Sequence, residues 1–132
     1  MNVERAMRFG DRVDGHLVQG HVETTAEVTA REEIPGELRL TIGCGADFAR
    51  RCLHKGSVTV DGVSLTVASV QGADFEVAVI PTTRDLTNLG ALRSGAEVHL
   101  EMDVLAKYVE ALIARAPTKL DENFLAAHGF LR

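Results

Sequence analysis

The sequence predicts a mainly all-β protein: a small, six-stranded, Greek-key antiparallel β-barrel with short helices and a C-terminal helix. Six short segments are strand-like, and apolar and polar residues alternate in most of them. Turn signals separate these segments at close spacing, which is typical of an antiparallel barrel rather than of a sheet with long crossover helices. Closing the sheet into a barrel also removes its free strand edges.

The first predicted strand covers residues 15–28 and follows an opening stretch, residues 1–10, that has no clear period. Gly15 and Gly20 each stand directly before a histidine in this strand. Glycine inside a strand marks a bulge or a close approach of the backbone to another group. We therefore expect both histidines to lie beside bent backbone.

The later elements follow from their own periodicities. In chain order they are a turn at 32–36, a strand at 37–42, a short helix at 46–53, a hairpin of strands 57–60 and 63–67, a strand at 75–80, a helical turn at 82–90 and a strand at 97–102. In the helical turn, a threonine is the expected N-cap and Gly90 the expected stop. Apolar residues at helical spacing predict an amphipathic helix over 104–113, which Pro117 ends.

The predicted domain organisation is one barrel over residues 1–116 and a C-terminal tail over residues 117–132. The tail carries four apolar residues able to form a small amphipathic segment: Phe124, Leu125, Phe130 and Leu131. Such a segment is expected to pack back on the barrel or to contact a partner.

Asp61-Gly62 joins the two strands of the predicted hairpin, and strict alternation on both sides makes this the clearest local signal in the chain. The polar positions of the hairpin share one face and carry hydroxyl groups: Ser57, Thr59, Ser64 and Thr66. Uncharged hydroxyls both donate and accept hydrogen bonds, which suits a polyol or a neutral heterocycle better than a phosphate. The alternative is an ordinary half-exposed sheet, in which threonine is a favoured residue.

Composition limits the functional classes. The chain has 132 residues, of which 45% are hydrophobic and 25% charged, so we expect a single globular domain. A formal charge of −5 without a basic block argues against a nucleic-acid partner. No apolar run is long enough to suggest a membrane partner, and the two cysteines and the lack of a signal peptide indicate a reduced, cytosolic protein.

Isolated polar residues leave several interpretations open. His16 and His21 fall on opposite faces of the predicted strand and lack further ligands, so no metal site is expected, and each can be an ordinary structural or surface histidine. Asp103 stands between the last strand and the last helix, where it can cap the helix or reach a ligand. Cys44 and Cys52 have no neighbouring base, and no Walker loop, GxGxxG or GxSxG motif is present.

Six segments, taken in order, resemble riboflavin synthase and the related lumazine-binding proteins. They are Asn2-Val3-Glu4-Arg5-Ala6, Gly15 to Val22, Lys55 to Val67, Ile80-Pro81-Thr82-Thr83, Thr87-Asn88-Leu89-Gly90, and Leu100 to Asp103 with Ala106 to Glu110. The resemblance is to the second of the family's two tandem barrels. The chain has no Met-Phe-Thr-Gly-Ile opening, it begins in what resembles the linker between barrels, and Ser64 stands where the first barrel usually has cysteine.

The resemblance implies a dismutation that needs no metal or organic cofactor. Two molecules of 6,7-dimethyl-8-ribityllumazine exchange a four-carbon unit, which gives riboflavin and 5-amino-6-ribitylamino-pyrimidinedione. Family members are usually trimers with active sites between barrels of different subunits, so the implied partners are the ribityl-lumazine or riboflavin and either further copies of the chain or a first-barrel domain. The alternatives are a non-catalytic lumazine or flavin carrier and a purely structural barrel.

The implied site residues are carried over at matching positions. The catalytic or orienting groups are His21, Ser64 and Asp103. The substrate contacts are Gly20, Val22, Lys55, Asp61, Thr66, Ile80 and Thr83. In this interpretation Val22 and Ile80 give apolar cover to the ring, while the hydroxyl groups form hydrogen bonds with the ligand.

Overall fold

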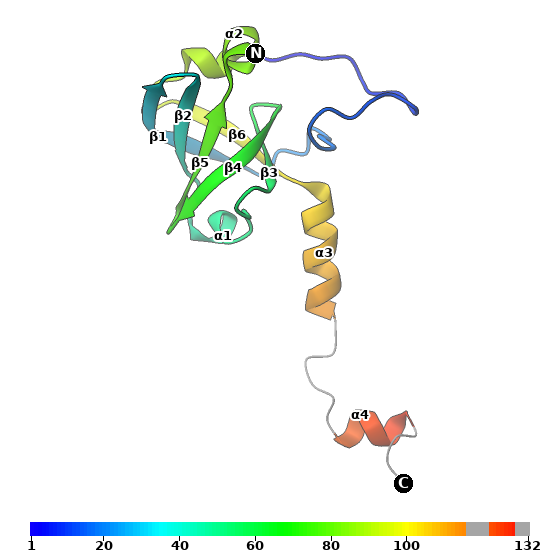
Figure 1. Cartoon of the computed structure of the whole chain (residues 1–132). Helices are drawn as coiled ribbons and strands as arrows, with labels where there is room; N and C mark the ends of the chain where they lie inside the picture. The colour runs from blue at the N-terminus through cyan, green and yellow to red at the C-terminus, as the bar shows by residue number, and fades with distance from the viewer. Residues whose placement is uncertain (116–121, 129–132) are drawn as a thin grey trace.

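Six antiparallel strands close into a barrel in the computed structural model of the chain, which describes residues 1–115 and 122–128. The strands are β1 (Thr24–Ile34), β2 (Glu37–Gly43), β3 (Ser57–Val60), β4 (Val63–Gln71), β5 (Asp74–Val79) and β6 (Glu97–Met102). Around the barrel they follow the order β1-β2-β5-β4-β3-β6 (Figure 1). Since β6 returns to lie beside β3 after the meander of β3, β4 and β5, the topology is a Greek key, and the predicted fold class is confirmed.

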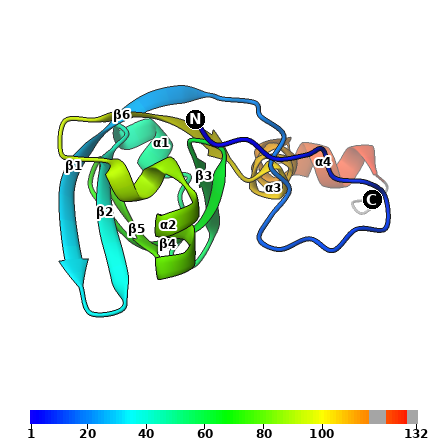
Figure 2. The same ribbon diagram turned by 90° about the horizontal axis from the view of Figure 1, so that it is seen from above.

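Alternating side chains fill the barrel. On β2 and β5, every second residue points inward and is almost completely buried, as for Leu40 opposite Val77 and Ile42 opposite Phe75. One end of the barrel receives Phe48, whose ring stacks on Phe75 with centroids 6.3 Å apart. Figure 2 looks onto the other end, which α2 (Pro81–Leu86) covers together with the buried Leu89 of η1 (Asn88–Ala91).

Residues 1–23, the N-terminal segment, contain no regular secondary structure. The strand expected at 15–28 was therefore predicted wrongly in its first half, because the ladder with β6 begins only at Thr24. In Figure 2 this segment loops outward on one side of the barrel before it returns to β1. Before Glu23, its polar groups bind side chains and a turn carbonyl of the barrel rather than forming a strand ladder.

One predicted turn and one predicted helix also differ from the structure. The turn between the first two strands occupies only Pro35 and Gly36, because residues 32–34 still pair with β2. The helix expected at 46–53 is α1 (Ala46–Ala49) and ends early. After it, the Arg51 amide donates to the Phe48 carbonyl three residues back at 3.0 Å, so the chain tightens into a turn.

The predicted threonine N-cap and the predicted Gly90 stop of the helical turn at 82–90 are both wrong for α2. The N-cap of α2 is Ile80, followed by Pro81 at the first helical position, so no threonine caps this helix. A threonine cap occurs one element later, where Thr87 Oγ1 accepts from the Leu89 amide at 3.3 Å. Gly90 lies inside η1 rather than stopping a helix, and an added Cβ there would collide with the Arg84 carbonyl oxygen.

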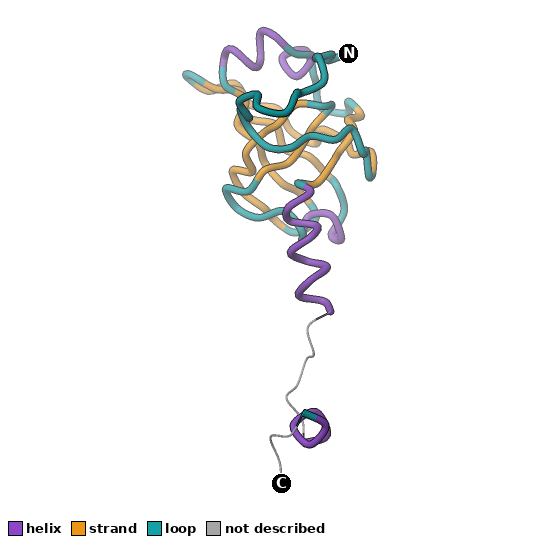
Figure 3. The backbone as a smooth tube through the Cα atoms, turned by 90° about the vertical axis from the view of Figure 1, so that its right-hand side faces the viewer, coloured by secondary structure: helices purple, strands orange, loops and turns teal. Residues whose placement is uncertain are grey.

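The C-terminal helix α3 (Val104–Arg115) projects away from the barrel (Figure 3). It extends the predicted helix by two residues. α4 (Glu122–Ala127) follows in the tail, whereas Pro117, Phe130 and Leu131 lie outside the described residues. None of the helices in the described ranges has the length and apolar content needed to cross a bilayer.

Candidate functional site

The outer wall of the β3–β4 hairpin carries the hydroxyl groups that the sequence places together. Ser57 lies directly opposite Thr66, and Thr59 lies opposite Ser64. The residues between them, including Val58 and Leu65, point into the core and are buried. The predicted shared face is therefore present as two cross-strand pairs.

Each hydroxyl pair continues onto β6. Thr59 is also the register partner of Glu101, so Ser64, Thr59 and Glu101 form one polar row across three strands. Asp103 follows Met102, whose partner is Val58, and the same register brings Asp103 to the level of Ser57 and Thr66. Two of the three predicted catalytic residues, Ser64 and Asp103, thus belong to adjacent rows of one wall.

The N-terminal segment covers the first of these rows. His16 bridges it, with Nδ1 at 2.6 Å from Ser64 Oγ and Nε2 at 2.9 Å from Thr59 Oγ1. The Gln19 amide donates to Glu101 Oε1 at 2.8 Å. As a result Thr59 is only 2% exposed and Glu101 only 3%, although both lie on the outer face of the barrel.

The second row stays accessible. Thr66 is exposed and Ser57 is half-buried, as is Ser64 at the edge of the covered row. A ligand that approaches this wall therefore meets Thr66 and the free side of Ser64, while Thr59 and Glu101 lie beneath the N-terminal segment.

Ile80 and Thr83 come to the same end of the barrel as Ser64. β5 runs antiparallel to β4, so the residues after β5 lie near the start of β4. Ile80 is 58% exposed and begins α2, and Thr83 is half-buried within it. Ile80 and Thr83, which are predicted to contact the ligand, therefore lie at the same end of the barrel as Ser64.

Gly20, His21 and Val22 lie exposed between two anchor points of the N-terminal segment. The first anchor is the Gln19 amide on Glu101, and the second is the Glu23 amide, which donates to the Leu100 carbonyl at 2.9 Å. The three residues therefore lie between contacts to Glu101 and Leu100, which are consecutive residues of β6.

Asp61 has structural partners at the hairpin turn. Its Oδ1 accepts from the His99 amide at 2.8 Å, and its Oδ2 accepts from Asn88 Nδ2 at 2.7 Å. Asn2 Nδ2 donates to the Asp61 carbonyl at 2.8 Å, which ties the start of the chain to the same turn. Lys55 is exposed, and its amide donates to the Val67 carbonyl at 2.8 Å.

His16 and Glu101 are the residues of this wall that the sequence did not single out as site residues. Gly15 carried a usable signal, because a glycine before a histidine suggested a close approach. The structure bears this out: a Cβ added at Gly15 would lie 2.6 Å from Ser64 Oγ. For Glu101 the signal was a carboxylate between Leu100 and Met102, both of which are buried.

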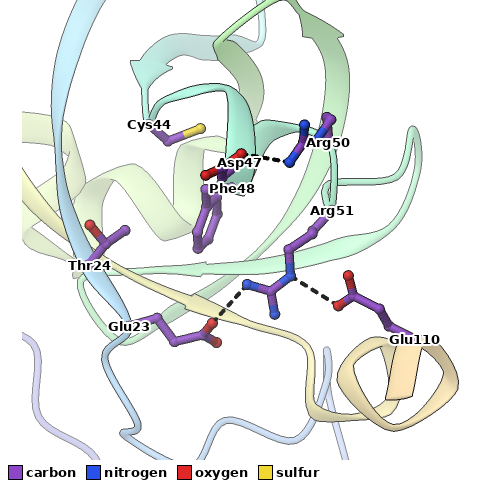
Figure 4. A pocket seen from close by; sticks show the side chains of 8 residues that line it. All are labelled: Glu23, Thr24, Cys44, Asp47, Phe48, Arg50, Arg51 and Glu110. Atoms are coloured by element: carbon purple, nitrogen blue, oxygen red, sulfur yellow. Dashed lines mark hydrogen bonds and ion pairs between the residues drawn. The ribbon is translucent and has the colours of Figure 1, made fainter. Parts of the chain in front are cut away.

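A separate cavity of about 450 Å³ opens at the α1 end of the barrel (Figure 4). Its most prominent feature is Arg51, which is held between Glu23 at 3.2 Å and Glu110 of α3 at 3.1 Å. Cys44 also lines it, and burial raises the pKa of that thiol. None of the predicted site residues lines this cavity.

The carboxylate beside the cavity is electrostatically stabilised. Burial by itself raises the pKa of Glu23, but hydrogen bonds from Lys107, the Met102 amide and Arg51 outweigh it, so the pKa lies below its ordinary value. Within residues 1–115 and 122–128, no group of three or more His, Cys, Asp or Glu side chains is arranged to hold a metal ion.

Comparison with protein families matches residues 19–103 to a family described as the lumazine binding domain. This chain belongs to that family. The match includes every site residue predicted above, from Gly20 to Asp103, and leaves out His16.

Curated relatives of this lumazine-binding domain are riboflavin synthases. The enzyme of Mycobacterium tuberculosis (strain ATCC 25618 / H37Rv) is 49% identical over 120 residues, which are 88% of this chain and 59% of the relative. The enzyme of Actinobacillus pleuropneumoniae is 36% identical over 135 residues, 98% of this chain and 63% of the relative. The lumazine-binding domain described here therefore spans little more than half of these enzymes.

Solved structures share its fold. LumP complexed with riboflavin superposes with a TM-score of 0.65 at 22% identity, over 71% of this chain and 51% of that one. LumP complexed with 6,7-dimethyl-8-(1'-D-ribityl) lumazine gives a TM-score of 0.63 at 21% identity, over 70% and 52% of the two chains. At these identities the likeness is one of fold.

Proposed function

We propose that this chain is the lumazine-binding half of a riboflavin synthase. It binds 6,7-dimethyl-8-ribityllumazine and contributes to the dismutation that yields riboflavin and 5-amino-6-ribitylamino-pyrimidinedione. The observation that carries the proposal is the pair of hydroxyl rows on the β3–β4 wall, with Thr66 and Ser64 accessible, inside the region that matches the family. The cytosolic location expected from the sequence belongs to the same proposal.

The chemistry of the wall suits this substrate. A ribityl chain presents several hydroxyls, each of which both donates and accepts, and a serine or threonine hydroxyl pairs with either role. The lumazine ring is flat and neutral, so it needs apolar cover rather than a counter-ion. Holding two such rings face to face accelerates the dismutation, because the reacting groups are already oriented. Polar groups nearby stabilise the deprotonated methyl group and the adduct.

In this proposal the wall residues have distinct roles. Ser64, Thr66 and Thr83 form hydrogen bonds with the ligand, and the apolar side chains of Val22 and Ile80 cover the ring. A second group of residues orients the reacting atoms or moves protons at the rim of the site: His21 and Asp103, beside Gly20. Lys55 and Asp61 are further contacts in the proposal, and for Asp61 the partners at the hairpin turn support a structural role as well.

The substrate-bound state is proposed to include a second barrel. The wall is open rather than enclosed, since Thr66 and Ile80 are both exposed in this chain. A first-barrel domain or another copy of the chain is therefore needed to cover the ligand. The exposed apolar residues of α3 support association of this kind.

A second function, a non-catalytic lumazine or flavin carrier, is favoured by Ser64, which stands where the first barrel of the resembling family usually has cysteine. Mixing the chain with 6,7-dimethyl-8-ribityllumazine separates the two functions. Appearance of riboflavin fluorescence supports the synthase, and a shifted lumazine spectrum without riboflavin supports the carrier. An unchanged spectrum contradicts both.

Thr66 provides the direct test of the proposed binding wall. Thr66→Val keeps the shape of the side chain and removes the hydroxyl, so a covered ligand group loses its partner and binding weakens by about 1–3 kcal/mol. Thr66→Ser retains the hydroxyl and is the matched control. Fluorescence titration with riboflavin measures both variants. Equal affinity of parent and Thr66→Val removes Thr66 from the site.

A further inference from the structure

Thr59 and Glu101 are the only polar or charged residues that are almost completely buried in the part of the chain that the structure describes. They are register partners on β3 and β6, and both face outward. What buries them is the N-terminal segment, which reaches them through His16 and Gln19. The covered row is therefore a polar contact built between two parts of the chain.

His16 connects this buried row to the accessible part of the wall. Its Nε2 lies 2.9 Å from Oγ1 of Thr59, which is 2% exposed and cannot reach a ligand. Its Nδ1 lies 2.6 Å from Oγ of Ser64, which is half-buried and can. The imidazole is thus anchored at one nitrogen and contacts the proposed ligand-binding hydroxyl with the other.

The contact restricts Ser64. A serine hydroxyl has one hydrogen and two lone pairs, and the bond to His16 uses one of these three positions and selects one rotamer. The remaining positions point away from the imidazole ring and are left for another hydrogen-bond partner. A neutral imidazole has one donor and one acceptor nitrogen, so the hydroxyl orientations of Thr59 and Ser64 are coupled through it.

Gly15 makes this arrangement possible. Its φ of +106° lies in a region that side chains with a Cβ rarely adopt, and an added Cβ would approach Ser64 Oγ to 2.6 Å. The backbone can therefore bring His16 down onto the wall only with glycine at this position.

We propose that His16 is a positioning residue of the ligand site: it holds the Ser64 hydroxyl in the orientation that binds the ribityl-lumazine or riboflavin. The inference rests on the proposed function and adds to it a residue outside the matched family region, residues 19–103. Thr59 serves as the buried anchor, and Ser64 is the group that contacts the ligand.

Two amide substitutions distinguish the contact of His16 with Ser64 from its contact with Thr59. His16→Asn places an amide group where Nδ1 stands and keeps a partner for Ser64, whereas His16→Gln places one where Nε2 stands and keeps a partner for Thr59. We expect riboflavin affinity to stay within about threefold of the parent in His16→Asn and to fall about tenfold in His16→Gln. We expect the opposite order for stability. His16→Gln should have the higher urea midpoint, because it keeps a partner for the buried Thr59 hydroxyl.

Fluorescence titration with riboflavin, urea unfolding and a comparison with Ser64→Ala complete the test. Because His16 acts through Ser64, the affinity losses of His16→Gln and Ser64→Ala should not add in the double variant. Equal riboflavin affinity of the Asn and Gln variants, or additive losses, overturns the positioning role. A parent chain that binds no riboflavin rejects the proposed function and this inference with it, whereas a parent that binds normally while all His16 variants match it rejects this inference alone.

Discussion

The Asp103 carboxylate caps a helix and is also a proposed functional group of the ligand site. Its Oδ1 accepts from the Leu105 amide at 3.0 Å, so it is the N-cap of α3, as one of the two sequence interpretations expects. Its position at the end of β6 also brings it to the level of Ser57 and Thr66 on the β3–β4 wall. Capping needs only a side-chain acceptor, whereas moving a proton needs the carboxylate.

Two substitutions at Asp103 separate these roles. Asp103→Asn keeps an oxygen acceptor for the helix and removes the charge, so we expect stability within a few tenths of a kcal/mol of the parent and a loss of turnover of about tenfold or more. Asp103→Ala should also lower the free energy of unfolding by about 1 kcal/mol through the lost cap. Urea unfolding and steady-state formation of riboflavin measure the two effects. Full activity of Asp103→Asn would leave the residue with its capping role only.

At the scale of elements, charged side chains attach α3 to the barrel. Lys107 Nζ lies 3.1 Å from Glu23 Oε1, and Glu110 lies 3.1 Å from Arg51, which also bonds Glu23 (Figure 4). Burial by itself lowers the pKa of Arg51, but the two carboxylates outweigh it and raise the pKa. Glu23 is the centre of this network, because it also accepts from the Met102 amide at the end of β6.

The lowered pKa of Glu23 predicts the sign of a pH effect. A carboxyl group whose pKa is lower in the folded chain stabilises the fold above its ordinary pKa of 4.5 and loses that stabilisation as the pH falls through the folded value. Glu23→Gln should therefore reduce the free energy of unfolding by about 1 kcal/mol at neutral pH, the upper range for ion pairs that solvent reaches. The difference from the parent should shrink as the pH falls below the ordinary value.

Urea unfolding at several pH values measures this difference. Glu4→Gln is the matched control, because Glu4 is an exposed residue of the N-terminal segment and forms no ion pair with the residues that the structure describes. A gap between parent and Glu23→Gln that stays constant down to about pH 3 would contradict the assignment to the carboxylate charge.

For the whole molecule, α3 presents an apolar stripe to solvent. Its members recur at helical spacing and are between 55% and 70% exposed: Leu105, Tyr108, Val109, Leu112 and Ile113. Lys107 and Glu110, which contact the barrel network, lie on another side of the helix. A helix with one face attached by charges and another face apolar and exposed is typical of an association surface.

Self-association through this stripe is testable in solution. We expect the parent chain to sediment as an oligomer and Leu112→Lys to shift the population toward monomer by tenfold or more in dissociation constant, because an ammonium in a desolvated apolar contact costs more than the about 1–3 kcal/mol of an unpaired neutral polar group. Ala114→Lys, at an exposed position away from the stripe, is the control. Sedimentation velocity that finds the parent monomeric at all concentrations rejects association through α3 by the chain alone.

Much of the fold follows from patterns that are local in the chain. Strict alternation on both sides of Asp61-Gly62 determines the hairpin register, and with it the pairing of Ser57 with Thr66 and of Thr59 with Ser64. The same reasoning located β2, β5 and β6 to within one or two residues. It failed for residues 15–23, where Gly15 indicated a close approach of the backbone but the local pattern did not show that Ser64 would be the neighbour.

The amino-acid sequence by itself therefore determined most of the strands, the hydroxyl face and the family resemblance, because each depends on residues close together in the chain. Tertiary structure alone decided which part of that face is covered. His16 and Ser64 are 48 residues apart, and Gln19 and Glu101 are 82 apart. Such pairs meet only after the barrel has closed and the N-terminal segment has folded over it, so no local periodicity encodes them.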